Sequence, residues 1–293
     1  MKSEKTAELE THNVSTTLTE ACFRITQTLQ MDKSVSRLEA RVLAAHAWQV
    51  SSSWLIAHDT DPLTLLQYAQ FQALLERRLR GEPIAYITGK REFFGHSFNV
   101  SPDVLIPRPE TELLVEVMLE QIPADRRLDI LELGTGSGCI AISLALVRPL
   151  ARITAVDKES AALAIARENA RQLHASLTFL KSDWFDALAT QKFDYIISNP
   201  PYVPTDDSHL NCGDVRFEPL SSLHSGMNGM ADLKQIIERA LLFLRAQGGL
   251  FLEHGYNQAK NTATELTRHG FKEVQTWQDL SGNDRITAGF LSE

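Results

Sequence analysis

Apolar side chains in the first part of the chain recur with the period of an α-helix. Residues 37–48 carry apolar positions every three to four residues, and residues 63–79 repeat this spacing before a helix-ending Gly-Glu-Pro triplet at 81–83. The first of these helices is expected to pack through Leu38, Val42, Ala45 and Trp48. We therefore predict a small helical domain over residues 1–83, in which residues 1–15 form a loose polar tail.

The periodicity changes after residue 83. Two short strand-like runs flank Gly95, so residues 84–108 are predicted to hold a β-hairpin that joins two domains. From residue 109 onward, strand-like runs alternate with helical spacing, which predicts an α/β domain over 109–293 with a mainly parallel sheet. We expect strands at 128–133, 151–156, 176–180, 193–198 and 249–253, helices at 111–121, 139–146 and 235–245, and a final antiparallel pair at 271–276 and 285–291.

The composition is that of an ordinary globular protein. The chain has 293 residues, of which 43% are hydrophobic and 23% charged, and its formal net charge is -8. This acidic balance argues against a long footprint on nucleic acid, which needs a basic face. The three cysteines show neither a disulfide framework nor zinc-ligand spacing, so no metal is expected. The polar start and the lack of a long apolar run predict a cytoplasmic protein without a membrane segment.

The strand predicted at 193–198 is followed by Asn199-Pro200-Pro201-Tyr202. Prolines lack the N–H that a sheet interior needs, so the chain must leave the sheet at Asn199 in a stiff, extended turn. Ligands of open α/β sheets bind at this end of the strands. The Asn199 oxygen and the Pro200 carbonyl can accept both hydrogens of a planar NH2 group, against whose face Tyr202 can lie. The alternative is a rigid loop without a ligand.

A glycine-rich turn follows the strand predicted at 128–133. It reads Gly134-Thr135-Gly136-Ser137-Gly138 and leads directly into a helix. Glycines in such a turn let the backbone approach a ligand and let the helix pack close to the sheet. The spacing differs from that of the dinucleotide-binding fingerprint, because the third glycine comes one residue early. A tight turn without a ligand remains an alternative.

The next two strands end at polar residues that fit a nucleoside. Asp157 lies about twenty residues after the glycines, where an acid bonds the two ribose hydroxyls, and it would also suit a helix cap. Asp183 and Trp184 follow the strand at 176–180 and offer a carboxylate and an indole for an adenine. Trp184 is equally consistent with an ordinary core aromatic residue.

Together these motifs resemble a known enzyme family. The glycine turn, Asp157, the pair at 183–184 and the Asn-Pro-Pro-Tyr tetrad are similar to those of S-adenosylmethionine-dependent methyltransferases that act on planar nitrogens. Residues 80–89, 92–95, 104–112 and 217–219 resemble the release factor glutamine methyltransferases more specifically, in a match that runs from about 80 to 202. Asn228 differs from the aspartate usual in such proteins, a change that concerns a loop contact and not the chemistry.

The resemblance implies a fold, a cofactor and a substrate. The fold is a Rossmann-like, seven-stranded methyltransferase sheet preceded by a small helical domain. S-adenosylmethionine would contact residues 134–138, Asp157, Asp183, Trp184 and Asn199. The tetrad at 199–202 would bind the substrate, with Asn199, Pro200 and Tyr202 as its catalytic members. The methylated group would be the glutamine amide in the Gly-Gly-Gln loop of bacterial class I peptide chain release factors, and residues 1–83 would recognise that protein.

Three other functions have specific requirements. An adenine-N6 nucleic-acid methyltransferase uses the same tetrad, but it would need base flipping and a basic surface, and the sequence shows no basic run. A binding module without activity would not need an intact tetrad and cofactor turn. A nicotinamide dehydrogenase would need a different glycine spacing.

Overall fold

The computed structural model describes residues 12–292, which divide into two compact units between Thr88 and Gly89. The predicted tail at 1–15 lies outside the described residues, apart from residues 12–15. Of these, Asn13 caps the first helix, which begins at Val14, so the last two residues of the predicted tail are helical. No helix formed by residues 12–292 is long and apolar enough to cross a membrane.

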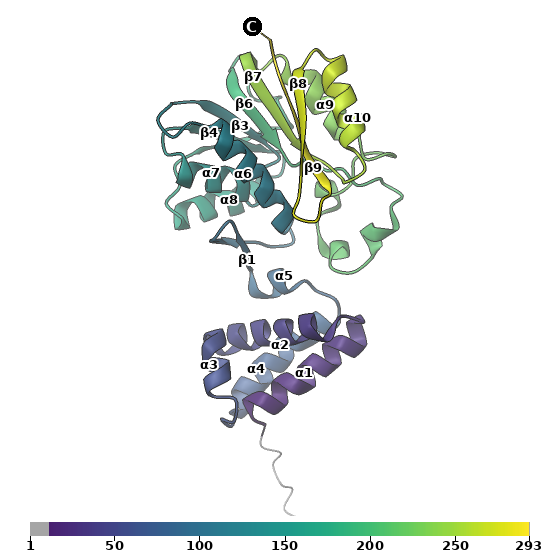
Figure 1. Cartoon of the computed structure of the whole chain (residues 1–293). Coiled ribbons are helices and arrows are strands. Elements are labelled where there is room, and N and C mark those ends of the chain that lie inside the picture. Colours follow the sequence, from purple (N-terminus) through teal and green to yellow (C-terminus); the bar gives the residue numbers. More distant parts are fainter. Residues whose placement is uncertain (1–11, 293) are drawn as a thin grey trace, which may run out of the picture. The chain divides into compact units, whose positions relative to one another are not determined.

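The regular elements that residues 12–88 of the first unit form are all helices (Figure 1). The side chains of Asn13, Asp32, Ser51 and Thr64 each accept a hydrogen bond from the first turn of the helix that follows, which fixes four of the starts. The helices pack around a common apolar core. They are α1 (Val14–Leu29), α2 (Lys33–Trp48), α3 (Ser52–Ala57), α4 (Leu65–Leu79) and α5 (Ile84–Thr88).

The packed face of α2 differs from the prediction. Leu38 is 63% exposed, whereas Ala40, Leu43 and Ala44 are fully buried. The helix is therefore rotated so that Ala40, Leu43 and Ala44 face the core that α2 shares with the neighbouring helices. Trp48 is buried as expected, and its indole N–H donates to the Gln67 carbonyl at 2.9 Å. Periodicity alone could not choose between two apolar faces of one helix.

The second unit begins with the predicted hairpin, formed by β1 (Lys90–Phe93) and β2 (His96–Asn99). Asn169 of helix α8 (Ser160–Gln172) accepts from the Asn99 N–H at 2.7 Å and donates to the Asn99 carbonyl at 3.0 Å, which attaches the hairpin to this unit. Residues 84–88, which the sequence analysis assigned to the linker, form α5 of the first unit. After the hairpin come a 3₁₀ turn (Pro109–Thr111) and α6 (Glu112–Gln121).

A seven-stranded sheet forms the centre of the second unit, in the order β5-β4-β3-β6-β7-β9-β8. All neighbouring strands pair in parallel except β9, which is antiparallel to both β7 and β8. The predicted Rossmann-like seven-stranded sheet is thus confirmed. The strands are β3 (Asp129–Leu133), β4 (Arg152–Asp157), β5 (Thr178–Lys181), β6 (Phe193–Ser198), β7 (Leu244–Glu253), β8 (Lys272–Gln278) and β9 (Asp284–Phe290).

Helices cover both faces of this sheet (Figure 1). Successive strand residues alternate between two cores: Ile130 packs on the face of α6, α7 (Cys139–Val147) and α8, and Leu131 on the face of α9 (Ala231–Ala240) and α10 (Ala259–Arg268). The helix predicted at 235–245 was placed too late, since α9 ends at Ala240 and Leu244 already belongs to β7. The segment between β6 and α9 contains short 3₁₀ turns at Ser208–Asn211, Val215–Phe217 and Leu220–Ser222.

Candidate active site

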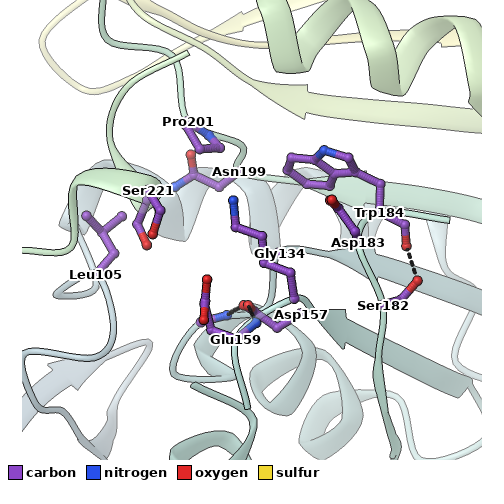
Figure 2. A pocket seen from close by; sticks show the side chains of 13 residues that line it. Leu105, Gly134, Asp157, Glu159, Ser182, Asp183, Trp184, Asn199, Pro201 and Ser221 are labelled. Carbon is purple, nitrogen blue, oxygen red and sulfur yellow. Dashed lines mark hydrogen bonds between the residues drawn. The ribbon is translucent and has the colours of Figure 1, made fainter. Parts of the chain in front are cut away.

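The residues predicted to form the site meet at the carboxyl ends of β5, β4, β3 and β6. These strands are neighbours, and the direction of the chain across the sheet changes between β3 and β6, where α/β proteins hold their ligands. A cleft at this edge has an empty volume of about 600 Å³, part of which is open to solvent. It is lined by Leu105, Gly134, Gly136, Asp157, Lys158, Glu159, Ser182, Asp183, Trp184, Asn199, Pro201, Ser221 and Ser222 (Figure 2).

The glycine turn has two parts: one lines the cleft, and the other lies where two helices pack together. Gly136 has φ +54°, lines the cleft and would have nothing within 4 Å of a Cβ atom, so its backbone is open to a ligand. Gly138 has φ +82°, and a Cβ there would approach Ile142 Cδ1 to 2.8 Å and Ala166 Cβ to 3.1 Å. Its small size therefore lets α7 pack against α8. Thr135 and Ser137 are buried and do not line the cleft.

Asp157 ties the glycine turn to the end of β4. Its Oδ2 accepts from the Gly136 N–H and its Oδ1 from the Glu159 N–H, both at 2.9 Å. Because α8 begins only at Ser160 and has Glu159 as its N-cap residue, Asp157 orders the approach to the helix and does not occupy the cap position itself. Burial raises the pKa of Asp157. Each oxygen keeps a lone pair for a ligand hydroxyl on the cleft side (Figure 2).

Trp184 belongs both to the cleft and to a core. Its ring lines the cleft near Gly134, where a Cβ would lie 3.5 Å from the indole, and it also packs partly against the core beneath α9. The residue has φ +46°, and the Ser182 hydroxyl donates to its carbonyl at 2.8 Å (Figure 2). Asp183 lines the same wall. Both functions that the sequence left open for Trp184 are therefore compatible with its position.

Asn199 lies on the wall between the cleft and a second pocket. Its Nδ2 donates to the Thr111 hydroxyl at 3.2 Å, which leaves the side-chain oxygen available to a ligand. The second pocket, whose empty volume is also about 600 Å³, shares Leu105, Asn199 and Ser222 with the cleft. Pro200 and Tyr202 line this second pocket, whereas Pro201 lines the cleft. The tetrad thus faces both spaces.

Contacts from distant segments hold the tetrad in place. Gln258 Nε2 donates to the Tyr202 carbonyl at 3.0 Å and to the Gly229 carbonyl at 3.3 Å. Glu218 Oε2 accepts from the Ile106 N–H at 3.0 Å, and its other oxygen pairs with Arg108, which lines the second pocket. No motif in the sequence points to Gln258. A signal existed only for Glu218, within the family motif at 217–219.

Two fully buried carboxyls near the site were also missed. Burial raises the pKa of Glu132, at the end of β3 beneath the glycine turn, to about 8, and that of Glu253, the last residue of β7, to about 7. Nothing in their local sequence distinguishes them from ordinary strand residues. The difference noted at Asn228 proves conservative, since its Oδ1 accepts from the Met230 N–H at 3.2 Å, as an aspartate could. No group of His, Cys, Asp or Glu within residues 12–292 is arranged to hold a metal ion.

Family models and a solved structure show the broad class of protein to which the chain belongs. Residues 109–216 match the family model of the methyltransferase small domain, and residues 20–89 match that of the PrmC N-terminal domain. The crystal structure of a methyltransferase from Pyrococcus furiosus shares the fold, with a TM-score of 0.53 and 18% identity over 74% of this chain and 98% of that one. The second unit is therefore a methyltransferase domain of the Rossmann-like class.

Relatives that match nearly the whole chain define the family. The release factor glutamine methyltransferase of Bordetella pertussis is 46% identical over 264 residues, which are 90% of this chain and 98% of the relative. The protein of the same name from Escherichia coli K12 is 44% identical over 262 residues, or 89% and 94% of the two chains. The chain belongs to the release factor glutamine methyltransferase family, as the motifs indicated.

Proposed function

We propose that this chain transfers the methyl group of S-adenosylmethionine to the glutamine amide nitrogen in the Gly-Gly-Gln loop of bacterial class I peptide chain release factors. The observation that carries the proposal is the position of Asn199 on the wall shared by the cleft and the second pocket. A nucleoside cofactor in the cleft and a planar amide in the pocket would meet at this residue. Membership of the family supports the choice of substrate.

The cleft has the groups that S-adenosylmethionine requires. The open backbone at Gly136 suits its amino acid part, and the two oxygens of Asp157 suit the ribose hydroxyls. Asp183 and Trp184 offer an acceptor and a flat apolar surface for the adenine. We therefore assign the cofactor to Gly134, Gly136, Asp157, Asp183, Trp184 and the neighbouring Asn199, and we assign the acceptor amide to the tetrad.

The chemistry requires orientation more than proton removal. When bound, the cofactor supplies a methyl group on a positively charged sulfur, and that sulfur keeps the electron pair of the C–S bond that breaks. The Asn199 oxygen and the Pro200 carbonyl accept the two N–H groups of the glutamine amide, which raises the electron density on nitrogen and directs it to the methyl group. These bonds strengthen as positive charge develops on nitrogen, and the proton then leaves to water. Tyr202 forms a packing wall.

The residues that line the two cavities all belong to the second unit. We extend the proposal by assigning recognition of the protein substrate to residues 1–83. A groove in this unit combines two exposed apolar side chains, Phe23 and Ile56, with the basic Lys33, Arg37 and Arg41. Apolar surface flanked by basic groups suits an acidic, partly apolar protein segment.

One assay tests the proposed function. Purified protein and labelled S-adenosylmethionine are incubated with a class I release factor, with its variant carrying alanine for the loop glutamine, or with double-stranded DNA. We expect label only in the unaltered release factor. Labelling of the alanine variant would move the acceptor elsewhere, and labelling of DNA alone would replace the proposal by an adenine-N6 activity.

A further inference from the structure

A buried carboxyl lies directly behind the tetrad. Glu253 ends β7, the strand next to β6, and its side chain is only 2% exposed. The hydroxyls of Thr111 and Tyr202 face this carboxyl and stabilise its charged form. Within residues 12–292, the Oε2 atom of Glu253 has no hydrogen-bond partner. A buried carboxylate with an unpaired oxygen costs folding free energy, so stability does not explain its presence here.

Thr111 connects this carboxyl to Asn199. Its side chain is 2% exposed, and its oxygen accepts the hydrogen bond from Asn199 Nδ2 at 3.2 Å. A hydroxyl has a single proton to donate. If that proton points to the charged Glu253, which can only accept, the Thr111 oxygen is left to accept from the NH2 side of the Asn199 amide. The amide oxygen then faces the cleft and the pocket.

We propose that Glu253, acting through Thr111, is a positioning residue that fixes the Asn199 amide with its oxygen toward the methyl acceptor. The inference rests on the proposed function, because it concerns the orientation of the group that binds the glutamine NH2. Without these directed hydrogen bonds, the Asn199 amide could rotate by half a turn. It would then present its own NH2 to the NH2 of the substrate, and two donors repel each other.

The direction of the hydrogen bonds between Glu253, Thr111 and Asn199 depends on whether Glu253 is protonated. Burial is the largest influence and raises its pKa to about 7, Glu110 of the 3₁₀ turn acts in the same sense, and Arg285 of β9, Thr111 and Tyr202 oppose it. The adjacent His254 is buried and its pKa is lowered. A protonated Glu253 donates to Thr111 and releases the threonine proton toward Asn199. The rate of methyl transfer should therefore fall by about tenfold from pH 8 to pH 6, because the fraction of protein with a charged Glu253 falls.

Four variants test the inference in the full chain. Glu253→Gln keeps the shape but can donate to Thr111, and Thr111→Val removes the connection. Both should lower single-turnover transfer to the release factor by roughly 10- to 100-fold, as is typical when the partner of a functional group is lost. Both should also flatten the pH profile and leave the affinity for S-adenosylmethionine unchanged. Thr111→Ser should restore rate and profile, and Thr154→Val controls for the loss of a buried threonine hydroxyl elsewhere.

The outcomes separate the inference from the proposed function. If the wild-type protein binds S-adenosylmethionine but does not methylate the release factor, the proposed function is wrong and the inference falls with it. If the wild type is active and Glu253→Gln matches its rate and pH profile, only the inference is wrong. If Glu253→Gln does not fold, as judged by thermal unfolding, the comparison of Thr111→Val with Thr111→Ser decides. Equal rates for these two variants would overturn the inference.

Discussion

Removal of the Asp157 carboxylate gives the sharpest test of the cofactor site. The two oxygens of Asp157 each accept one backbone N–H at 2.9 Å and have lone pairs left for the two ribose hydroxyls. Hydrogen bonds to a charged group contribute about 1.5–3 kcal/mol each, but water replaces part of this in the emptied site. We expect Asp157→Ala to weaken binding of S-adenosylmethionine by roughly 1–3 kcal/mol, which is about 5- to 150-fold in Kd.

The substitution also removes the bond from Gly136 N–H, which orders the glycine turn. Part of the effect could therefore arise from a loosened turn and not from the ribose. Asp157→Asn separates the two contributions, because its single amide oxygen can still accept from one backbone N–H. We expect an intermediate Kd for this variant. Asp186→Ala is the matched control, since it removes the same charge from a residue that is paired with Arg239 and does not line the cleft.

Isothermal titration calorimetry with S-adenosylmethionine measures these affinities directly, and thermal unfolding without ligand reports the order of the turn. A Kd of Asp157→Ala within about twofold of the wild-type value would mean that the carboxylate only orders the start of α8. The nucleoside would then have to bind elsewhere in the cleft. A similar loss of affinity in Asp186→Ala would instead indicate a general effect of charge.

Three further changes test the acceptor side and the N-terminal unit. Asn199→Ala should lower single-turnover transfer by roughly 100- to 1,000-fold at saturating cofactor, and Asn199→Asp should retain partial activity; near-normal transfer by the alanine variant would refute the mechanism. Tyr202→Phe should be mild at pH 8 but should move the inflection of the pH profile upward, since it removes a hydroxyl that stabilises charged Glu253; an unmoved inflection would contradict this. Arg37→Glu combined with Ile56→Ala should raise KM for intact release factor and not for a Gly-Gly-Gln peptide; equal KM values for variant and wild-type protein on intact factor would exclude the groove.

Strand and turn signals made most of the catalytic unit predictable from sequence. The apolar run at 193–198 predicts a buried strand, and the two prolines after it must end that strand, so the place of Asn199 followed from local chemistry. The glycine turn and Asp157 follow neighbouring parallel strands, and the topology brings the carboxyl ends of such strands together. The cleft that these residues line could therefore be located without coordinates.

Helix faces and long-range contacts were not predictable in the same way. Both faces of α2 carry apolar residues, and only packing against the neighbouring helices selects Leu43 over Leu38 for the core. The end of α9 was misplaced because residues 241–245 suit a helix as well as a strand, and pairing with β6 decides the outcome. Glu253 resembles any polar residue at a strand end. Its meaning depends on Thr111, which is 142 positions away and reaches the same place only in the folded chain.

The contacts around the tetrad indicate why its geometry can be catalytic. Asn199 is held by Thr111, the carbonyl of Tyr202 is held by Gln258, and Glu218 fastens the segment that forms the far wall of the pocket. Each contact comes from a different part of the chain. If Asn199 and Pro200 accept the substrate amide as proposed, acceptors that are already fixed require little reorganisation free energy when methyl transfer begins. For a nucleophile as weak as an amide nitrogen, this rigidity is as important as the choice of an asparagine.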